Sequence, residues 1–420
     1  EAEHGCFTLF DWNYSHPQDA HLRAAHGRLF RWNHSLPPLP TPQQRLGIVV
    51  TPGQEGMFYF AHHVLLQQLA TQYTELEIHL ISFGAHDLWP RLQNQYPGLK
   101  VHTLSPRFGT ASHGPSFYEQ LLQLRQQLAL QWAYFWEVGT DTLSFLLPYF
   151  RLAPVQFSSW GSVSSTGHPD IDVFLSTPLL NPPTLSDPLT PPAEYFSETL
   201  IHLPQLSVGF EIHELQPPSD PVTSKQSCSI GCLHTPRKNS AAFLQALHDI
   251  LHRHQIQSPN IKVSVFMIES PHRAWQKELA QQVASALGAY AGAVEWLPRM
   301  SPDRFAQTLR SMDFLLDAFP FGGGKLAYDS LIHGIPLLSL RGSHLRGRIP
   351  TAFYTELTIY DDQFSPVQSP EDYVASALRL IQEPALRQHL RQRLIAQRQA
   401  LTQRDLAKDF IQALDQMRTR

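Results

Sequence analysis

The sequence has few cysteines and lacks a long apolar run. Its 420 residues include three cysteines, Cys6, Cys228 and Cys232. Because these cannot form the spaced pairs of a disulfide framework, we expect a reducing compartment and a cytoplasmic location. Cys228 and Cys232 have no second Cys or His pair at zinc spacing, so we expect them to be buried apolar residues. No run approaches the ~20 apolar residues that cross a bilayer, and we expect no membrane span.

A large excess of charge of either sign is also absent. Charged residues make up 16% of the chain and hydrophobic residues 42%, which is typical of a globular protein. The formal net charge of -4 provides no general attraction to polynucleotides or anionic membranes, so we expect no nucleic-acid partner. At 420 residues the chain exceeds the size at which one hydrophobic core usually stops growing. We therefore expect two domains.

Expected strands alternate with expected helices along most of the chain, which favours two α/β domains with parallel sheets. In the first half, the pattern predicts strands at 45–51, 76–84, 99–104, 130–136 and 154–160, and helices at 58–72, 116–128 and 141–150. In the second half, it predicts strands at 228–235, 262–267, near 294 and at 314–316, and helices at 241–254 and 274–287. The predicted organisation is a lead-in with a proline-rich linker at 1–44, a first domain at 45–210, an interdomain linker at 211–227, a second domain at 228–380 and closing helices at 381–420.

The most informative segment is 314–348, FLLDAFPFGGGKLAYDSLIHGIPLLSLRGSHLRGR. It predicts a buried strand, a glycine turn, a helix that starts at Lys325, a second buried strand and a basic loop. Glycines let the backbone approach a ligand closely, and the N–H groups at a helix start attract anions. The segment has neither GxxxxGK[ST] nor GxGxxG. A phosphate-binding turn and an ordinary crossover with a tight turn are both open at this point.

Several segments resemble one family. FPFGGG at 319–324, followed by a helix and by GxPxxxLxGxxxRGR at 334–348, resembles the bacterial branch of the O-GlcNAc transferase and SPINDLY-like protein glycosyltransferases, which are related to the bacterial cytoplasmic N-glycosyltransferases. The resemblance continues, in the same order along the chain, in RLGIVVTPGQEGMF, FWEVGTDTLSFLLPYFRLAPVQFSSWGSVSSTGHPDIDVFLST, YFSETLIHLPQLSVGF and WLPRMSPDRFAQTLRSMDFLLDAF. It spans most of 45–380. It implies a GT-B fold, with two Rossmann-like domains facing a cleft, and sugar transfer from a nucleotide sugar.

Such a transfer requires that cations or N–H groups stabilise the departing diphosphate. We expect no metal-chelating DxD sequence in the chain, so we predict that lysine and arginine bind the diphosphate, with neither a metal nor a cofactor. The resemblance implies that Lys238 is this catalytic cation and that Arg237 assists it. A solvated lysine at a helix start is the alternative. His234 stands where relatives often carry Gln, which leaves its role open.

The resemblance also implies donor binding at the glycine turn. Lys325 and Leu326 replace the small polar residues common in relatives, which leaves the donor specificity open. Asp329 matches the acid that holds the nucleotide ribose, and its alternative role is an i,i+4 ion pair with Lys325. The other expected donor-binding residues are Gly322, Gly323, Gly324 and Arg346 at the turn, and Leu297, Arg299, Met300 and Phe305 around the nucleotide base.

The general base has two candidates. Relatives with a histidine in the first loop would place it near Gly56, where this chain has GQEG. Glu55 is the nearest proton acceptor there, and Glu137 is the second candidate because it ends a strand of the same domain. Either acid can instead be structural. The expected acceptor-side residues are Gln54, Thr166 and His168, although a lone histidine is more often a hydrogen-bonded structural residue.

Together these features predict a metal-independent, inverting glycosyltransferase that acts on a protein or peptide. A UDP-hexose or UDP-GlcNAc is the expected donor, and GDP-fucose stays open because SPINDLY-type relatives use it. Ser, Thr and Asn are all open as acceptor side chains. Two other functions are open as well: a catalytically impaired scaffold that binds nucleotide sugars, and a glycosyltransferase that acts on a glycan or small molecule.

Overall fold

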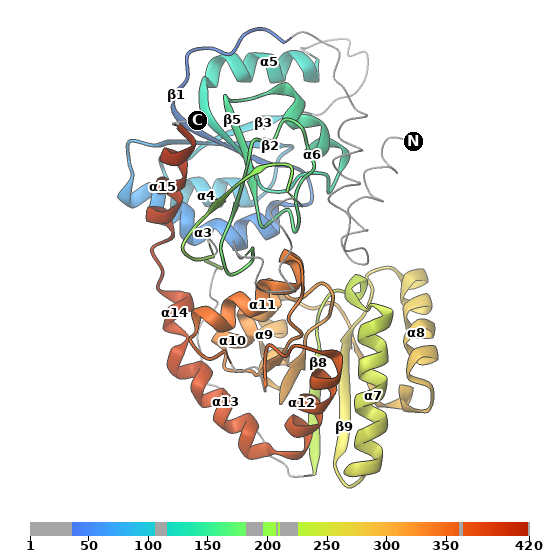
Figure 1. Cartoon of the computed structure of the whole chain (residues 1–420). Helices are drawn as coiled ribbons and strands as arrows, with labels where there is room; N and C mark the ends of the chain where they lie inside the picture. Colours follow the sequence, from blue (N-terminus) through green and yellow to red (C-terminus); the bar gives the residue numbers. More distant parts are fainter. Residues whose placement is uncertain are drawn as a thin grey trace. The chain divides into compact units, whose positions relative to one another are not determined.

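The structure is a computed structural model, and it describes residues 36–105, 116–181, 196–206, 209–210, 226–360 and 364–418. The chain divides into two compact units (Figure 1). The first unit comprises Glu1–Glu211 and Asp405–Arg420, and the second comprises Ile212–Arg404. Most of the expected lead-in at 1–44 and nearly all of the expected linker at 211–227 lie outside the described residues.

The first unit is built around a parallel sheet of seven strands, in the order β3-β2-β1-β4-β5-β6-β7. Their bounds are β1 Gln43–Val50, β2 Glu77–Phe83, β3 Lys100–Leu104, β4 Leu130–Phe135, β5 Val155–Ser159, β6 Val173–Ser176 and β7 Thr199–His202. Central strands of a parallel sheet are covered on both faces and therefore read as apolar runs, as Leu46, Ile48 and Val50 of β1 do. Since β1 pairs with β4, the loops that follow these two strands leave the sheet side by side.

Five helices and one 3-10 turn are described around this sheet: α3 Glu55–Gln72, α4 Leu88–Gln95, α5 Phe117–Leu128, α6 Thr142–Leu146, η2 Leu147–Phe150 and α15 Leu406–Arg418. Capping boxes start two of them, at Ser116 before α5 and at Asp141 before α6. The single helix expected at 141–150 is instead α6 followed by η2, which contains Pro148 near its start. The C-terminal α15 lies beside α3, where the N–H of Leu406 donates to Gln68 Oε1 at 2.8 Å (Figure 1).

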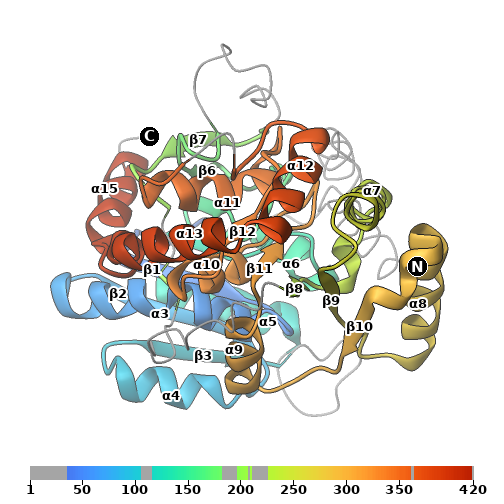
Figure 2. The ribbon, with the colours of Figure 1, turned by 90° about the horizontal axis from the view of Figure 1, so that it is seen from below.

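The second unit contains a parallel sheet of five strands, in the order β10-β9-β8-β11-β12. Their bounds are β8 Ser227–Cys232, β9 Lys262–Ile268, β10 Val294–Leu297, β11 Phe314–Leu316 and β12 Leu337–Leu338. The helices are α7 Ala241–Gln257, α8 Arg273–Leu287, α9 Pro302–Arg310, α10 Lys325–Ile332, α11 Leu345–Glu356, α12 Pro370–Gln382, α13 Pro384–Gln397 and α14 Gln399–Thr402, with 3-10 turns η4 Pro236–Lys238 and η5 Gly288–Ala293. Figure 2 shows α7 and α8 side by side near β9 and β10, and the two helices are in contact.

Two expectations from composition can be compared with these elements. Cys228 and Cys232 are free thiols buried in the core around β8, as expected of small apolar residues. Burial raises the pKa of the Cys228 thiol to about 12 and also raises the pKa of Cys232. Within the described part of the chain, every helix is too short or too polar to cross a membrane.

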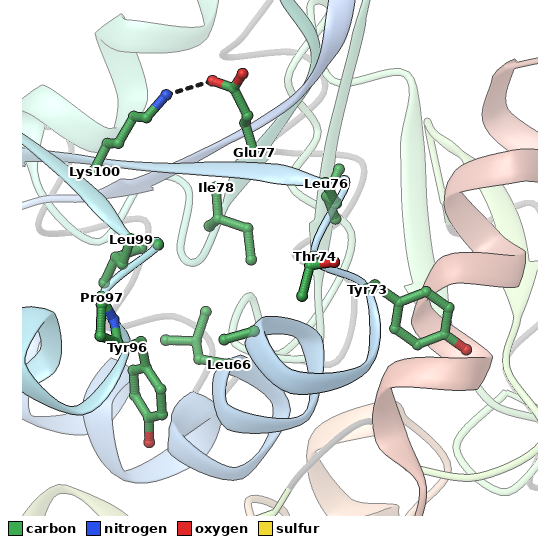
Figure 3. Close-up of a pocket in the computed structure, with 12 residues that line it drawn as sticks. Leu66, Tyr73, Thr74, Leu76, Glu77, Ile78, Tyr96, Pro97, Leu99 and Lys100 are labelled. Carbon is green, nitrogen blue, oxygen red and sulfur yellow. Dashed lines mark hydrogen bonds and ion pairs between the residues drawn. The ribbon is translucent and has the colours of Figure 1, made fainter.

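A cavity of about 490 Å³ opens at the amino ends of β2 and β3 in the first unit (Figure 3). Leu66, Ile78 and Leu99 point into it, whereas the ion pair between Lys100 and Glu77 lies on the other side of the strands. The candidate residues of this unit follow the carboxyl ends of β1, β4 and β5. The cavity therefore lies at the opposite end of the sheet from them.

Candidate functional site

The glycine turn of the second unit is organised by a buried acid. Asp317, the first residue after β11, is fully buried, and its Oδ1 accepts the N–H of Gly323 at 2.8 Å. A Cβ added at Gly322 would lie 2.8 Å from Asp317 Oδ2, and one added at Gly323 would lie 3.1 Å from Oδ1. The N–H of Gly322 also donates to the main-chain oxygen of Arg346 at 3.0 Å. Glycine is therefore required here because a carboxylate occupies the space of a side chain.

Lys238 belongs to the same turn although it is far from it in sequence. It ends the 3-10 turn η4, shortly after β8, and its Nζ donates to the main-chain oxygen of Gly322. The ammonium group also lies 4.0 Å from the ring centroid of Phe321. Burial lowers the pKa of Lys238 to about 8, and the negative charge of Asp317 acts in the opposite direction. The structure thus places a desolvated cation against the glycine turn.

The acid and the cation influence each other. Burial raises the pKa of Asp317 to about 6, while Lys238 and the hydrogen bonds from Ser339 and Gly323 oppose this rise. Near pH 7 both groups are consequently mostly charged. Sequence reasoning missed the role of Asp317, because an aspartate at a strand end is common and nothing in the pattern indicates which N–H it accepts.

His234, after β8, is a buried neutral imidazole. Its Nε2 lies 2.8 Å from Asn239 Oδ1, and because an amide oxygen only accepts, Nε2 carries the hydrogen. Burial lowers the pKa of His234 to about 4. Arg237, in contrast, is exposed on η4. The structure therefore places His234 under the Lys238 loop as a structural support, with Arg237 on the outer face of that loop.

The helix after the turn carries the ion pair that was the alternative role for Asp329. Lys325 Nζ lies 2.6 Å from Asp329 Oδ2 and 2.8 Å from Oδ1, on the first two turns of α10. Both side chains are largely buried, with 21% and 15% of their surfaces exposed. Leu326 is half-buried on the same helix, and Arg346 is buried on α11. A ribose that binds Asp329 would have to share this carboxylate with Lys325.

The residues expected around the nucleotide base follow β10. Leu297 ends that strand, Arg299 is exposed in the next loop, and Met300 Sδ accepts a hydrogen bond from Thr308 at 3.3 Å. Phe305 is half-buried on α9. Since all five strands are parallel, these residues leave the same edge of the sheet as Lys238 and Asp317. They follow the outermost strand, with β9 and β8 between β10 and β11.

In the first unit, two loops join through polar contacts. Thr51 Oγ1 donates to Asp141 Oδ2 at 2.7 Å. Gln54 Nε2 donates to Thr140 Oγ1 at 2.7 Å and to the same Asp141 oxygen at 3.3 Å. This network holds the loop after β1 against the loop after β4, so Gln54 is a buried connecting residue.

The two candidate bases differ in their surroundings. Glu55 lies in the first turn of α3, and its Oε2 accepts the N–H of Gly53 at 2.7 Å. Glu137 is half-buried in the loop after β4, two residues beyond the last residue of that strand. Burial raises its pKa to about 7, and the nearby Asp141 adds to the rise. A pKa near neutral pH is the value that suits a carboxylate to general-base chemistry.

Thr166 and His168 are buried and bonded within the first unit. Both the N–H and the hydroxyl of Thr166 donate to Glu198 Oε1, the former at 2.7 Å. His168 Nδ1 accepts the N–H of Asp170 at 3.0 Å, its ring lies 4.2 Å from that of Tyr149, and burial lowers its pKa to about 3. These contacts match the structural alternative for a lone histidine. The partner of Thr166, Glu198, was not foreseen, because it lies 32 residues away.

The chain does contain one DxD sequence, Asp170-Ile171-Asp172, in the first unit. Asp172 Oδ2 forms an ion pair with Arg151 at 2.8 Å and accepts the N–H of Gln156 at the same distance. Asp172 thus secures β5 and its preceding loop. Among the described residues, the side chains form no cluster of three or more histidines, cysteines or acids that could hold a metal ion.

The two parallel-sheet α/β units agree with the predicted GT-B fold class. The solved structure of a Thermobaculum terrenum O-GlcNAc transferase mutant superposes with a TM-score of 0.74 and 17% identity, covering 97% of this chain and 75% of that one, and this likeness confirms the fold class. *Anabaena* HepE, solved with UDP and glucose, has a TM-score of 0.51 and 12% identity, covering 90% and 100%.

Sequence comparison identifies relatives of the same kind, although no protein-family model matches the chain. A probable SPINDLY UDP-N-acetylglucosamine–peptide N-acetylglucosaminyltransferase of *Eustoma exaltatum* subsp. *russellianum* is 27% identical over 198 residues, or 46% of this chain and 20% of that protein. The UDP-glucose:protein N-β-glucosyltransferase of *Actinobacillus pleuropneumoniae* serotype 5b is 23% identical over 262 residues, or 61% and 39%. The resemblance predicted from the motifs is confirmed. The chain spans well under half the length of these curated relatives.

Proposed function

We propose that the chain transfers a sugar from a UDP-sugar to a side chain of a protein or peptide. The observation that carries this proposal is the contact between Lys238 Nζ and Gly322, which puts a cation against a glycine turn at a sheet edge. The names of the relatives support a UDP-sugar as donor and a protein or peptide as acceptor. The rest of the proposal assigns roles to the residues around that contact.

The donor diphosphate is assigned to Lys238 and the glycine turn, with Arg237 and Arg346 as further cations. Lys238 is half-buried, and a half-buried ammonium group stabilises a leaving diphosphate more strongly than a fully solvated one, because water screens it less. Protein cations then do the work that a metal does in other transferases, and we propose a metal-independent reaction. Asp329 accepts hydrogen bonds from the ribose hydroxyls, and it loses part of its contact with Lys325 when it does so. Leu297, Arg299, Met300 and Phe305 are assigned to the nucleotide base.

The general base is assigned to Glu137 in preference to Glu55. A hydrogen bond holds each carboxylate, from the N–H of Gly53 to Glu55 and from Thr140 to Glu137, but a pKa of about 7 suits Glu137 to proton transfer at neutral pH. In a single inverting displacement, the acceptor oxygen or nitrogen bonds to the anomeric carbon and its proton goes to Glu137. The bond from that carbon to the UDP oxygen breaks, and its electron pair leaves with UDP.

The acceptor is a Ser, Thr or Asn side chain. Gln54, Thr166 and His168 are assigned to support the acceptor-side loops, because each is buried and hydrogen-bonded inside the first unit. Their replacement should therefore act through the stability of those loops.

A transfer assay with mass-spectrometric detection tests this proposal. The purified chain is incubated in EDTA with UDP-glucose, UDP-GlcNAc or GDP-fucose and with matched peptides that contain Ser and Thr, Asn, or none of these. We expect one UDP-sugar to modify one peptide class, and Lys238→Ala to abolish the product. Binding of UDP without transfer to any peptide would favour the scaffold or a glycan acceptor. Absence of both binding and transfer would overturn the proposal.

A further inference from the structure

We propose that Asp317 is a positioning residue for the donor diphosphate, because its buried carboxylate ties the glycine turn to the sheet and maintains the charge of Lys238 beside it. This inference rests on the proposed function, since it concerns the same donor site. It adds a residue that would not touch the sugar nucleotide but would determine how the residues that touch it are arranged.

Four hydrogen bonds fix Asp317 in place. Its main-chain N–H donates to Leu338 O at 2.9 Å, and its main-chain oxygen accepts from the hydroxyl of Tyr373 at 2.8 Å. Its carboxylate accepts from Ser339 Oγ at 3.0 Å and from the N–H of Gly323 at 2.8 Å. The first bond ties Asp317 to β12 and the second ties it to α12. Because Asp317 is fixed in this way, its bond to Gly323 holds the glycine turn at a fixed place relative to the sheet.

The same turn receives Lys238. Lys238 Nζ is bonded to the oxygen of Gly322, and the carboxylate of Asp317 is bonded to the N–H of Gly323, the next residue. Asp317 therefore acts on the cation in two ways. It holds the carbonyl that Lys238 contacts, and its negative charge counteracts the loss of charge that burial imposes on the ammonium group.

Other titratable groups around the pair do not change charge at neutral pH. Burial lowers the pKa of His234 to about 4. Burial also raises the pKa values of the hydroxyls of Tyr354 and Tyr373, both of which sense the charge of Asp317. His234 and the two tyrosines are thus neutral where Lys238 and Asp317 are both charged. The ligands also lose protons in this range, but they do so equally in every titration. A difference in pH dependence between two variants with the same ligand would then report on Lys238 and Asp317.

The direction of the expected effect follows from the charges. Removal of the carboxylate charge lowers the pKa of Lys238, so its ammonium loses the proton at a lower pH. In Asp317→Asn the amide oxygen can still accept from Gly323 and the amide nitrogen can donate to Ser339, whose hydroxyl can also accept. The variant therefore removes the charge while it retains the hydrogen bonds.

The test is calorimetric titration of UDP, and of inorganic pyrophosphate as a base-free probe, between pH 6 and pH 9. For the unchanged protein, affinity should fall as pH rises through about 8. In Asp317→Asn this fall should begin about one pH unit lower, which makes binding about fivefold weaker at pH 8, about tenfold weaker at pH 9 and nearly unchanged at pH 6. An equal loss at every pH, or no loss, would overturn the charge role.

Two further variants separate the roles. Arg keeps its charge at all these pH values, so Lys238→Arg should remove the fall near pH 8, and adding Asp317→Asn to it should no longer shift the profile. Ser339→Ala removes one of the anchors of the carboxylate and should weaken binding severalfold at pH 8 and above, where Asp317 stays charged although the loss of this hydrogen bond raises its pKa. Unchanged affinity in Ser339→Ala would overturn the positioning role, even if Asp317→Asn failed to fold by circular dichroism.

These outcomes are distinguishable from a failure of the proposed function. Pyrophosphate or UDP binding with the expected profiles, but without sugar transfer, would support the role of Asp317 and count against the transferase. Binding of GDP in place of UDP would show that the proposed donor nucleotide is wrong. The role of Asp317 could still be tested, with GDP as the probe. No binding of pyrophosphate or any nucleoside diphosphate would overturn the role of Asp317.

Discussion

The buried acid of the second unit and the half-buried acid of the first unit have opposite surroundings. Asp317 has a cation beside it and four hydrogen bonds, so it is held in one position. Glu137 has a second acid, Asp141, as a charged neighbour, and burial raises its pKa to about 7. This difference supports the two roles that we propose: Asp317 organises an anion site, and Glu137 takes up a proton.

The largest expected effect on donor binding and turnover is that of replacing Lys238, the cation beside the Asp317 turn. Lys238→Ala should lower kcat about 10²- to 10³-fold and weaken UDP binding, because a buried donor to the leaving diphosphate is lost. The circular dichroism spectrum should not change, since the variant relieves the cost of burying an ammonium group. Steady-state kinetics with the best UDP-sugar provide the measurement, and unchanged turnover would remove Lys238 from the site.

The next effect is at Glu137. Glu137→Gln should lower kcat about 10²- to 10⁴-fold because the proton acceptor is lost. For the unchanged protein, a base must be deprotonated, so kcat should rise with pH through about 7, below the pH near 8 at which Lys238 loses its proton. A pH series of single-turnover rates measures both, and Glu137→Gln should lack the rise near pH 7.

The companion variant Glu55→Gln decides between the two acids of the first unit. The acid whose replacement causes the larger loss of kcat, and removes the inflection near pH 7, is the base. A larger effect at Glu55 would return the assignment to the residue that sequence reasoning placed first.

A smaller effect is expected at Asp329. If it binds the ribose, Asp329→Asn should weaken UDP about tenfold and leave inorganic pyrophosphate unchanged, because a charge-assisted hydrogen bond contributes ~1.5 to 3 kcal/mol. The matched variant Lys325→Met breaks the same ion pair but retains the carboxylate, so UDP should bind at least as well as before. Equal weakening of both ligands by Asp329→Asn would indicate a structural role for the ion pair.

The smallest effect in this series is on stability at the turn. Gly322→Ala would place a Cβ 2.8 Å from Asp317 Oδ2 and 3.1 Å from Pro350, so it should destabilise the second unit by about 1 to 3 kcal/mol. Gly292 has no atom within 4 Å of the corresponding position, and Gly292→Ala should change stability by about 0.5 kcal/mol or less. Urea unfolding of both variants measures the difference. Equal stabilities would show that the turn can move away from Asp317.

Periodicity predicted the longer strands and helices, because each has an unbroken apolar face. The strand expected at 130–136 is β4, and the helix expected at 241–254 is α7 with three further residues. Short strands were missed, since Val173–Ser176 and Thr199–His202 have only four residues each and lie among prolines and polar loops. Each of these strands is held in the sheet by pairing with its neighbours, and the local sequence carries no information about that pairing.

Motifs predicted which residues belong to the candidate site, but contacts between residues far apart in the sequence could not be predicted. The glycine turn was visible as three consecutive glycines, and Lys238 was found by resemblance. The contact between Lys238 and Gly322 spans 84 residues, and neither its hydrogen bond nor its desolvation can be read from the sequence. The pKa values of Asp317 and Glu137 likewise depend on burial, which only the folded chain determines.

The most direct test of the division between donor binding and proton transfer is calorimetric titration of UDP into two variants in parallel, Glu137→Gln and Lys238→Ala, at pH 7. We predict that Glu137→Gln binds UDP as tightly as the unchanged protein, whereas Lys238→Ala binds it at least tenfold more weakly. Equal loss of affinity in both variants, or full affinity in Lys238→Ala, would contradict the account.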